Sequence, residues 1–267
     1  MTALQKVVCG VDGGGASAEA AHQAAALVAP GGVLELIAVA GESGTGLSAA
    51  AVLSKSGARR ALDQIAHELR GCDARIDTRI VYGRPPHEVL MRESAASDLL
   101  VVARHSRSRL GGIAMGSTAS NLAQRAHVPL LIASKPPHGG TFPDRILVAA
   151  GGPGHPERAV LMAGQISRTT GADITLVRLD WSPRPQRPEL AAAVAQLRRV
   201  GAEPVEILTP GLPARKIPQL AAHERAALVV LGSRGLNGAR SLSSISERVA
   251  QNAPCSVLIV RPPADDR

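Results

Sequence analysis

The sequence predicts an α/β protein built from two tandem domains, each a parallel β-sheet flanked by helices. Short apolar runs without polar alternation recur along the 267 residues, as expected of strands that are buried on both faces. Ala-rich segments with helical spacing separate these runs, and that alternation is typical of a parallel sheet. The same order of runs returns in the second half of the chain, which predicts two copies of one unit.

The repeat can be followed strand by strand. The apolar runs of the first half are Val7–Val11, Val33–Val39, Asp98–Val102 and Pro129–Ala133, which correspond to Ile146–Ala150, Asp173–Leu179, Ala227–Leu231 and Ser256–Val260. A Gly-x-Pro segment also recurs, as Gly83–Pro86 and Gly211–Ala214. Helices are expected over Ala16–Val28, Lys55–Arg70 and Pro86–Ser97, and each half should supply about five strands.

A segment rich in Pro and Gly, Lys135–Pro143, lies between the halves and can continue neither a strand nor a helix. We therefore expect a first domain over residues 1–135, a linker over 136–143 and a second domain over 144–267.

The composition excludes several classes of protein. Apolar residues make up 45% of the chain and charged residues 19%, so a full core is expected and intrinsic disorder is not. With one Trp, one Tyr and one Phe, the chain lacks the stacking platforms of single-stranded nucleic-acid binders. The net charge of +8 is spread along the sequence, which favours a solvated Arg-rich surface over a specific nucleic-acid site.

The three cysteines, Cys9, Cys72 and Cys255, form no C-x-x-C pair, so neither a disulfide framework nor a metal site is expected. Isolated thiols suit a reducing cytosol. The chain start lacks the apolar core of a signal peptide and no stretch is apolar enough to span a membrane, so we expect a cytoplasmic protein.

Glycine-containing turns follow several expected strands, where helix N-termini of an open α/β sheet present N–H groups to a ligand. They are Val11–Gly15, Ala103–Ser106 with its counterpart Gly232–Gly235, and Gly116-Ser117 with its counterpart Ser243-Ser244. Taken alone, the same residues also fit purely structural roles. Gly13–Gly15 would form a strand-to-helix turn, Ser117 would be a helix N-cap, and Gly232 and Gly235 would be ordinary loop glycines.

These motifs resemble the universal stress protein family over nearly the whole chain. The similarity rests on Val11-Asp12-Gly13, on Gly83 and Pro85, on Asp98-Leu99, and on the closing stretch Ser246–Val260, which contains Ala253-Pro254-Cys255. The resemblance implies a Rossmann-like, adenine nucleotide alpha hydrolase-like sheet of strand order 3-2-1-4-5. It also implies that nucleotide-binding members hold ATP, with Mg²⁺, near the aspartate after the first strand and the glycine motif.

Carried over by resemblance, the first-half site comprises Asp12, Val39, Ala103, Ser106, Gly116 and Ser117. Asp12 would take the nucleoside, Ala103 and Ser106 would border the ribose, and the N–H groups of Gly116 and Ser117 would receive phosphate. Ala103 and Ser106 replace two motif glycines. In the second half Gly232, Gly235 and Ser244 match the motif, whereas Ser243 replaces a glycine and Gly151 replaces the aspartate, so this site is expected to be degenerate.

Three segments allow other interpretations. Gly13-x-Gly15-x-x-Ala18 resembles a dinucleotide fingerprint, but Glu35 stands near the start of its strand rather than at the end. His105 lies among Arg104, Arg107 and Arg109, either near phosphates or in a solvated basic loop. Trp181–Pro188 is either a rigid cover, a loop that binds a partner, or plain loop.

The function expected is therefore a stress-response module that binds an adenine nucleotide in the first domain, with at most slow ATP hydrolysis. The alternative is an interaction protein that binds a protein partner and no nucleotide. By the resemblance, Leu130–Ala133 and Val257–Val260 would pair across an internal pseudo-twofold, and two chains could form a homodimer. With so few aromatics, an adenine ring would have to rest on aliphatic side chains such as Val39.

Overall fold

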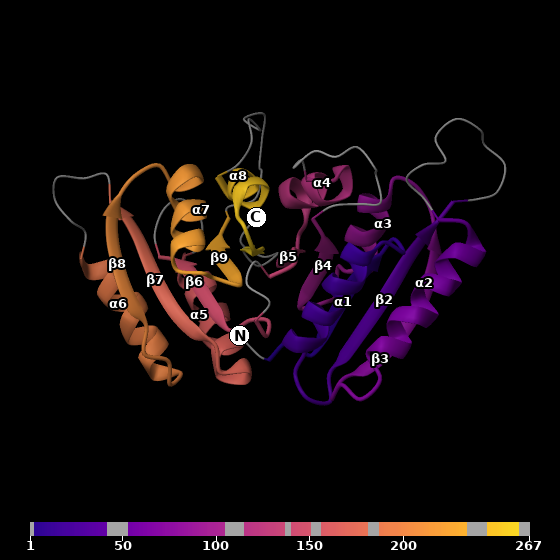
Figure 1. Ribbon diagram of the computed structural model, residues 1–267, viewed down its shortest axis with the longest axis horizontal. Helices are drawn as coiled ribbons and strands as arrows, with labels where there is room; N and C mark the ends of the chain where they lie inside the picture. The colour runs from indigo at the N-terminus through magenta and orange to yellow at the C-terminus, as the bar shows by residue number, and fades with distance from the viewer. Residues whose placement is uncertain are drawn as a thin grey trace. The chain divides into compact units, whose positions relative to one another are not determined.

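The computed structural model describes residues 3–41, 53–104, 115–136, 140–150, 156–180, 187–233 and 245–261. The chain forms two compact units. The first consists of Thr2–Leu122 with Leu130–Ser134, and the second of Ala123–Pro129 with Lys135–Arg267. Each unit contains a twisted parallel sheet with helices packed on it, so the predicted fold class is confirmed (Figure 1).

Strands and helices alternate in the first unit. Its elements are β1 (Lys6–Val11), α1 (Gly15–Leu27), β2 (Val33–Ala40), α2 (Lys55–Glu68), β3 (Arg75–Tyr82), α3 (Pro86–Glu93), β4 (Leu99–Ala103), α4 (Ser117–Arg125, which belongs to this unit as far as Leu122) and β5 (Leu130–Ala133). The strands pair in the order β3-β2-β1-β4-β5, all parallel. The predicted strand order 3-2-1-4-5 is thus confirmed for the first sheet.

The second unit repeats this plan. Its elements are β6 (Arg145–Ala149), α5 (Pro156–Thr170), β7 (Asp173–Asp180), α6 (Arg187–Arg199), β8 (Val205–Pro210), α7 (Pro213–His223), β9 (Leu228–Gly232), α8 (Ile245–Asn252) and β10 (Ser256–Val260). The strands pair in parallel in the order β8-β7-β6-β9-β10, which is the same order as in the first sheet.

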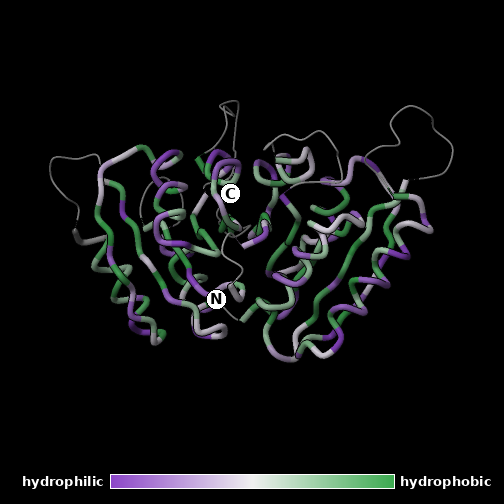
Figure 2. The backbone as a smooth tube through the Cα atoms, viewed as in Figure 1, coloured by the Kyte–Doolittle hydropathy of each residue, from purple (hydrophilic) through white to green (hydrophobic). Residues whose placement is uncertain are grey.

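The apolar runs of the sequence become the inner strands because both of their faces are covered. Val7, Val8 and Cys9 of β1 are fully buried, and so are Leu228 and Val229 of β9. Figure 2 shows green, apolar stretches along the strands and a mixture of purple and green along the helices. Helices α5 and α6 contact each other, and so do α7 and α8. This distribution is the one that right-handed crossovers produce, with two helices on each face of the sheet.

The eight predicted strands agree with the observed ones to within one residue at either end. Helix α3 is shorter than predicted: it ends at Glu93, whereas the prediction placed its end at Ser97. The hydroxyl of Ser97 donates to the carbonyl oxygen of Ser94 at 2.8 Å, and the backbone N–H of Ser97 donates to the same oxygen at 2.9 Å. A side chain that bonds to nearby backbone competes with helical hydrogen bonds and favours a turn there.

The outer strands β3 and β8 were not located from the sequence.

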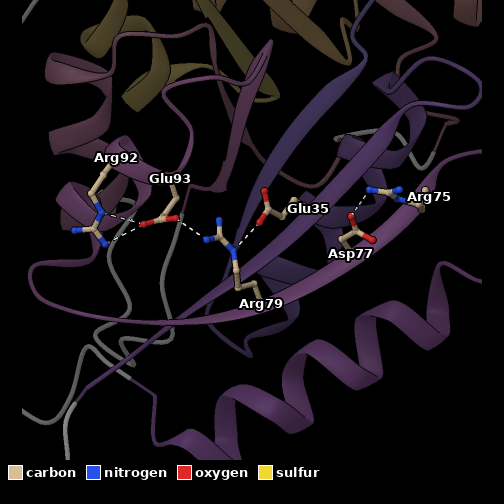
Figure 3. A network of polar contacts seen from close by, with 6 residues as sticks. All are labelled: Glu35, Arg75, Asp77, Arg79, Arg92 and Glu93. Carbon is tan, nitrogen blue, oxygen red and sulfur yellow. Dashed lines mark hydrogen bonds and ion pairs between the residues drawn. The ribbon is translucent and has the colours of Figure 1, made fainter.

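Strand β3 carries part of a cluster of charged residues, the β3 ion cluster, which comprises Glu35, Arg75, Asp77, Arg79, Arg92 and Glu93 (Figure 3). Arg79 contacts Glu35 of β2 at 2.7 Å and Glu93 of α3 at 2.8 Å. Burial alone would raise the pKa of Glu93, but its hydrogen bond with Arg92 and the charge of Arg79 lower that pKa overall.

None of the helices within the described ranges is both long and apolar enough to cross a membrane.

Candidate functional site

The carboxyl ends of the strands define the candidate site of the first unit. Strands β1 and β4 are neighbours, although β2 and β3 lie on the other side of β1. The chain therefore leaves β1 and β4 in opposite directions, and the crevice at such a switch point is where open α/β sheets bind ligands. Strand β1 ends at Val11 and β4 at Ala103.

Asp12 follows β1 directly and forms a tight local turn. Its Oδ1 accepts a hydrogen bond from the N–H of Gly14 at 2.9 Å. Gly13 adopts a left-handed φ of +74°, and Gly14 caps α1. The strand-to-helix turn that the sequence allowed is therefore present. A carboxylate offers about four lone-pair sites on its two oxygens, so a half-buried Asp12 can hold this turn and still accept from a ligand.

The start of α4 provides the second part of the site. The N–H of Gly116 donates to the carbonyl oxygen of Arg104 at 2.8 Å, and the carbonyl of Gly116 accepts from Ser120 at 2.9 Å. The N–H of Gly116, which the resemblance assigns to a phosphate, is thus bonded to Arg104 in this structure. Ser117 is the first helical residue and is exposed, so it is not the N-cap.

The remaining predicted residues of the first-half site differ in their exposure. Val39 lies in β2 and is only 8% exposed, whereas Ala103 ends β4 and is half-buried. Arg104, directly after Ala103, is a buried cation at this edge with 6% exposure. Ser106 lies outside the described residues, as do His105, Arg107 and Arg109.

An aromatic residue also lies at this edge of the sheet, contrary to the expectation of a purely aliphatic surface. Tyr82 ends β3 in register with Ala40, the last residue of β2, and is 45% exposed. The sequence pattern does not reveal Tyr82, because β3 mixes polar and apolar residues and therefore lacks the apolar run of a buried strand. The Gly-x-Pro motif that follows it directly was the available signal.

The corresponding edge of the second unit has different chemistry. Gly232 ends β9, whereas Gly235, Ser243, Ser244 and Gly151 lie outside the described residues. Arg261, directly after β10, is 3% exposed and donates to the hydroxyl of Ser233 at 3.1 Å. A buried guanidinium thus occupies the strand ends at which the first unit has Ser134.

Cys9 lies in β1 just before the site, and its thiol is not a nucleophile. Burial, together with the negative charge of Asp12, raises the pKa of Cys9 from 9.0 to about 12. Since the thiolate is the reactive form, the group stays protonated and inert near neutral pH.

The raised pKa of Cys9 predicts a loss of stability at alkaline pH. Below pH 9 the thiol is protonated in both states, and between pH 9 and about pH 12 only the unfolded state releases the proton. Between pH 8 and pH 10.5 the free energy of unfolding should fall by about 2 kcal/mol more in the wild type than in Cys9→Ala. Urea unfolding of both proteins at the two pH values measures this difference, and equal losses would contradict it.

Comparison with known proteins identifies the family. The family model described as universal stress protein family matches residues 3–134 and 143–261. Universal stress protein E of Salmonella typhi is 26% identical over 216 residues, which cover 70% of this chain and 69% of the relative.

A solved structure of similar fold spans both units of the chain. A universal stress protein from Archaeoglobus fulgidus superposes with a TM-score of 0.73 at 18% identity and covers 97% of both chains. A universal stress protein solved in complex with cAMP is 29% identical, with a TM-score of 0.42, and covers 45% of this chain and 97% of its own. With the family model matched twice in tandem, this chain belongs to the universal stress protein family.

Proposed function

We propose that the first unit binds an adenine nucleotide, ATP or a related one, at the carboxyl edge of its sheet. The observation that carries the proposal is the position of Asp12 at the β1–β4 switch point, in a chain that belongs to the universal stress protein family. Its carboxylate would accept hydrogen bonds from the nucleoside hydroxyls. Val39 would lie beside the base, and Ala103 and Ser106 beside the ribose.

The phosphates would lie at the start of α4. The first N–H groups of an α-helix have no partner within the helix and carry partial positive charge, so they favour an anion. Ser117 contributes both such an N–H and an exposed hydroxyl. Arg104, whose carbonyl holds Gly116, adds a buried positive charge near this turn.

Mg²⁺ would enter with the phosphates. Mg²⁺ in nucleotide sites is commonly held through phosphate oxygens and one or two carboxylates while it keeps several waters. In the described ranges no three His, Cys, Asp or Glu side chains come together as a metal site. With Asp12 assigned to the nucleoside, Mg²⁺ would be held chiefly through phosphate oxygens and waters.

Any hydrolysis of the nucleotide would be slow. A general base must lie within hydrogen-bond reach of the attacking water, directly or through one other water. Near Gly116 and Ser117, the described contacts are with Arg104, Ser120 and Asn121, and none of these supplies a carboxylate or an imidazole. Nucleotide binding would act by shifting surface loops toward or away from a partner. This requires that the nucleotide bind the two loop arrangements with different affinities.

A second candidate function is that of an interaction protein that binds no nucleotide. It is favoured by the internal hydrogen bonds of Asp12 and Gly116, which show that both turns are satisfied without a ligand. Residues Leu130–Ala133 and Val257–Val260 are then proposed to pair, so that two buried strands cover each other's edges. The second-half residues Gly232, Gly235, Ser243 and Ser244 would hold no ligand in this case.

Substitution of Asp12 tests the nucleotide proposal. Asp12→Asn keeps an oxygen that can accept from Gly14 but removes the charge that a nucleoside would meet. A ligand at about 100 times its dissociation constant adds about 2.7 kcal/mol to folding, which raises the melting temperature by several degrees. ATP with Mg²⁺ should produce this rise in the wild type and little of it in Asp12→Asn.

The matched control is Asp63→Asn, which changes an exposed aspartate of α2 and should leave the thermal shift unchanged. Purified wild type is also heat-denatured, and the supernatant is chromatographed for adenine nucleotide. No released nucleotide together with no thermal shift in the wild type would defeat the proposal and favour the interaction protein.

A further inference from the structure

Helix α4 belongs in part to each of the two compact units. The first unit includes the helix as far as Leu122, and the second unit includes it from Ala123 onward. The first helical residue is Ser117, which follows the turn in which the N–H of Gly116 donates to the carbonyl oxygen of Arg104. The end of α4 at which we propose that phosphate binds is therefore part of the first unit, and the other end is part of the second.

The last turn of α4 is held by side chains of the second unit. The amide nitrogen of Gln124 lies 3.0 Å and 3.1 Å from the two carboxylate oxygens of Glu247, in the first turn of α8. Glu247 is only 3% exposed, so this contact is shielded from water. The guanidinium of Arg261, directly after β10, donates to the carbonyl oxygen of Ala123. Both contacts lie within the second unit.

Arg261 also complements the electrostatics of α4. The last carbonyl groups of an α-helix have no partner within the helix and carry partial negative charge, so a cation is favourable there. The first N–H groups carry the opposite partial charge and favour an anion. A cation of the second unit and a phosphate bound in the first unit would therefore stabilise the same helix from its two ends.

The length of α4 makes its two ends depend on each other. The helix has 9 residues, and isolated helices shorter than roughly 12–15 residues are marginal in water. Its order therefore depends on the packing of its buried residues, such as Ala119 and Leu122, and on the contacts that hold its ends. Because helix formation is cooperative, contacts that fix one end lower the free-energy cost of ordering the other.

We propose that α4 couples nucleotide binding in the first unit to the contacts of its last turn in the second unit. The inference rests on the proposed function, because the phosphates supply the anion at Ser117. The two states are an α4 that is ordered throughout and an α4 whose first turn is frayed. The nucleotide favours the ordered state, and so do the contacts of Gln124 and Ala123. Since coupling is reciprocal, bound nucleotide should also strengthen those contacts.

Substitution of Gln124 in the full chain tests the coupling. Gln124→Leu removes the hydrogen bond to Glu247 with little change in side-chain size, and Gln124 is not among the residues proposed to bind nucleotide. The dissociation constant for ATP with Mg²⁺, measured by isothermal titration calorimetry, should rise about 5–10-fold. The matched control is Gln251→Leu. Gln251 donates to the same carboxylate at 3.5 Å but from within α8, so its loss should change the affinity for ATP by less than about twofold.

Hydrogen–deuterium exchange without nucleotide gives a second readout, which does not depend on binding. Gln124→Leu should speed the exchange of the backbone amides of Ser120–Leu122 by about 5–10-fold, although these residues belong to the first unit. Circular dichroism checks that every variant is folded. If Gln124→Leu is not, Arg261→Met takes its place, because it removes the cation from the carbonyl oxygen of Ala123.

Failure of the coupling can be told apart from failure of the proposed function. A wild type that binds ATP no more tightly than Gln124→Leu would overturn the coupling and leave the nucleotide site standing. An equal loss of affinity in Gln251→Leu, or unchanged exchange of Ser120–Leu122 in Gln124→Leu, would also overturn it. A wild type that binds no ATP would defeat the proposed function and this inference with it.

Discussion

Replacement of Gly32 by alanine is expected to lower the free energy of unfolding of the first unit by about 3 kcal/mol. Gly32 lies in the turn between α1 and β2, where a Cβ would be 2.8 Å from the carbonyl oxygen of Gln5 and 2.9 Å from that of Ala29. Both oxygens already accept hydrogen bonds, from Val33 at 2.7 Å and from Gly32 itself at 2.8 Å. Backbone held in this way cannot move aside as a flexible side chain would.

Gly15→Ala is the matched control for Gly32→Ala. Gly15 is the first residue of α1, and a Cβ there would meet nothing within 4 Å. Its replacement should change stability by less than about 0.5 kcal/mol, because alanine is the better helix former. Urea unfolding followed by the fluorescence of Tyr82, the single tyrosine of the chain, reports on the first unit. Equal midpoints for wild type and Gly32→Ala would show that the turn can relax.

The inner strands could be predicted from the sequence because burial on both faces leaves an unmistakable apolar run. Strands β1 and β9 are such cases, and their bounds agree with the prediction to within one residue. The outer strands β3 and β8 have one unpaired edge and exposed positions, so their residues need not be apolar. A polar run such as Arg75–Tyr82 then resembles a loop until its neighbours are known.

The residue types of the candidate site could be predicted from the sequence, but their hydrogen-bond partners could not. Asp12 and Ser117 were identified as polar residues at strand and helix ends, and the structure places them there. That the N–H of Gly116 bonds to Arg104 depends on how the chain enters α4, which residue types do not determine. Tyr82 was missed for the same reason as its strand.

The second large effect is expected at Asp98, a motif residue whose role the sequence left open. Its Oδ2 accepts hydrogen bonds from the backbone N–H groups of Gln5 and Lys6, both at 2.8 Å. Asp98 thereby fastens the start of β1 to the start of β4, at the sheet edge opposite the candidate site. Asp98→Ala should lower the free energy of unfolding by about 2–3 kcal/mol, since hydrogen bonds to a charged acceptor are the stronger kind.

A graded series separates this role from a general effect of charge. Asp98→Asn keeps an oxygen acceptor without the charge and should cost about half as much as Asp98→Ala. Asp63→Ala, which removes an exposed carboxylate of α2, should change stability by less than about 0.5 kcal/mol. Urea unfolding of the three variants gives the order. If Asp98→Asn were as unstable as Asp98→Ala, the hydrogen bonds to the Asp98 side chain would not be what stabilises the start of β1. The second unit has Ala227 at this position, whose side chain offers no acceptor, and the N–H of Ala227 donates to the carbonyl oxygen of Arg145 at 2.9 Å.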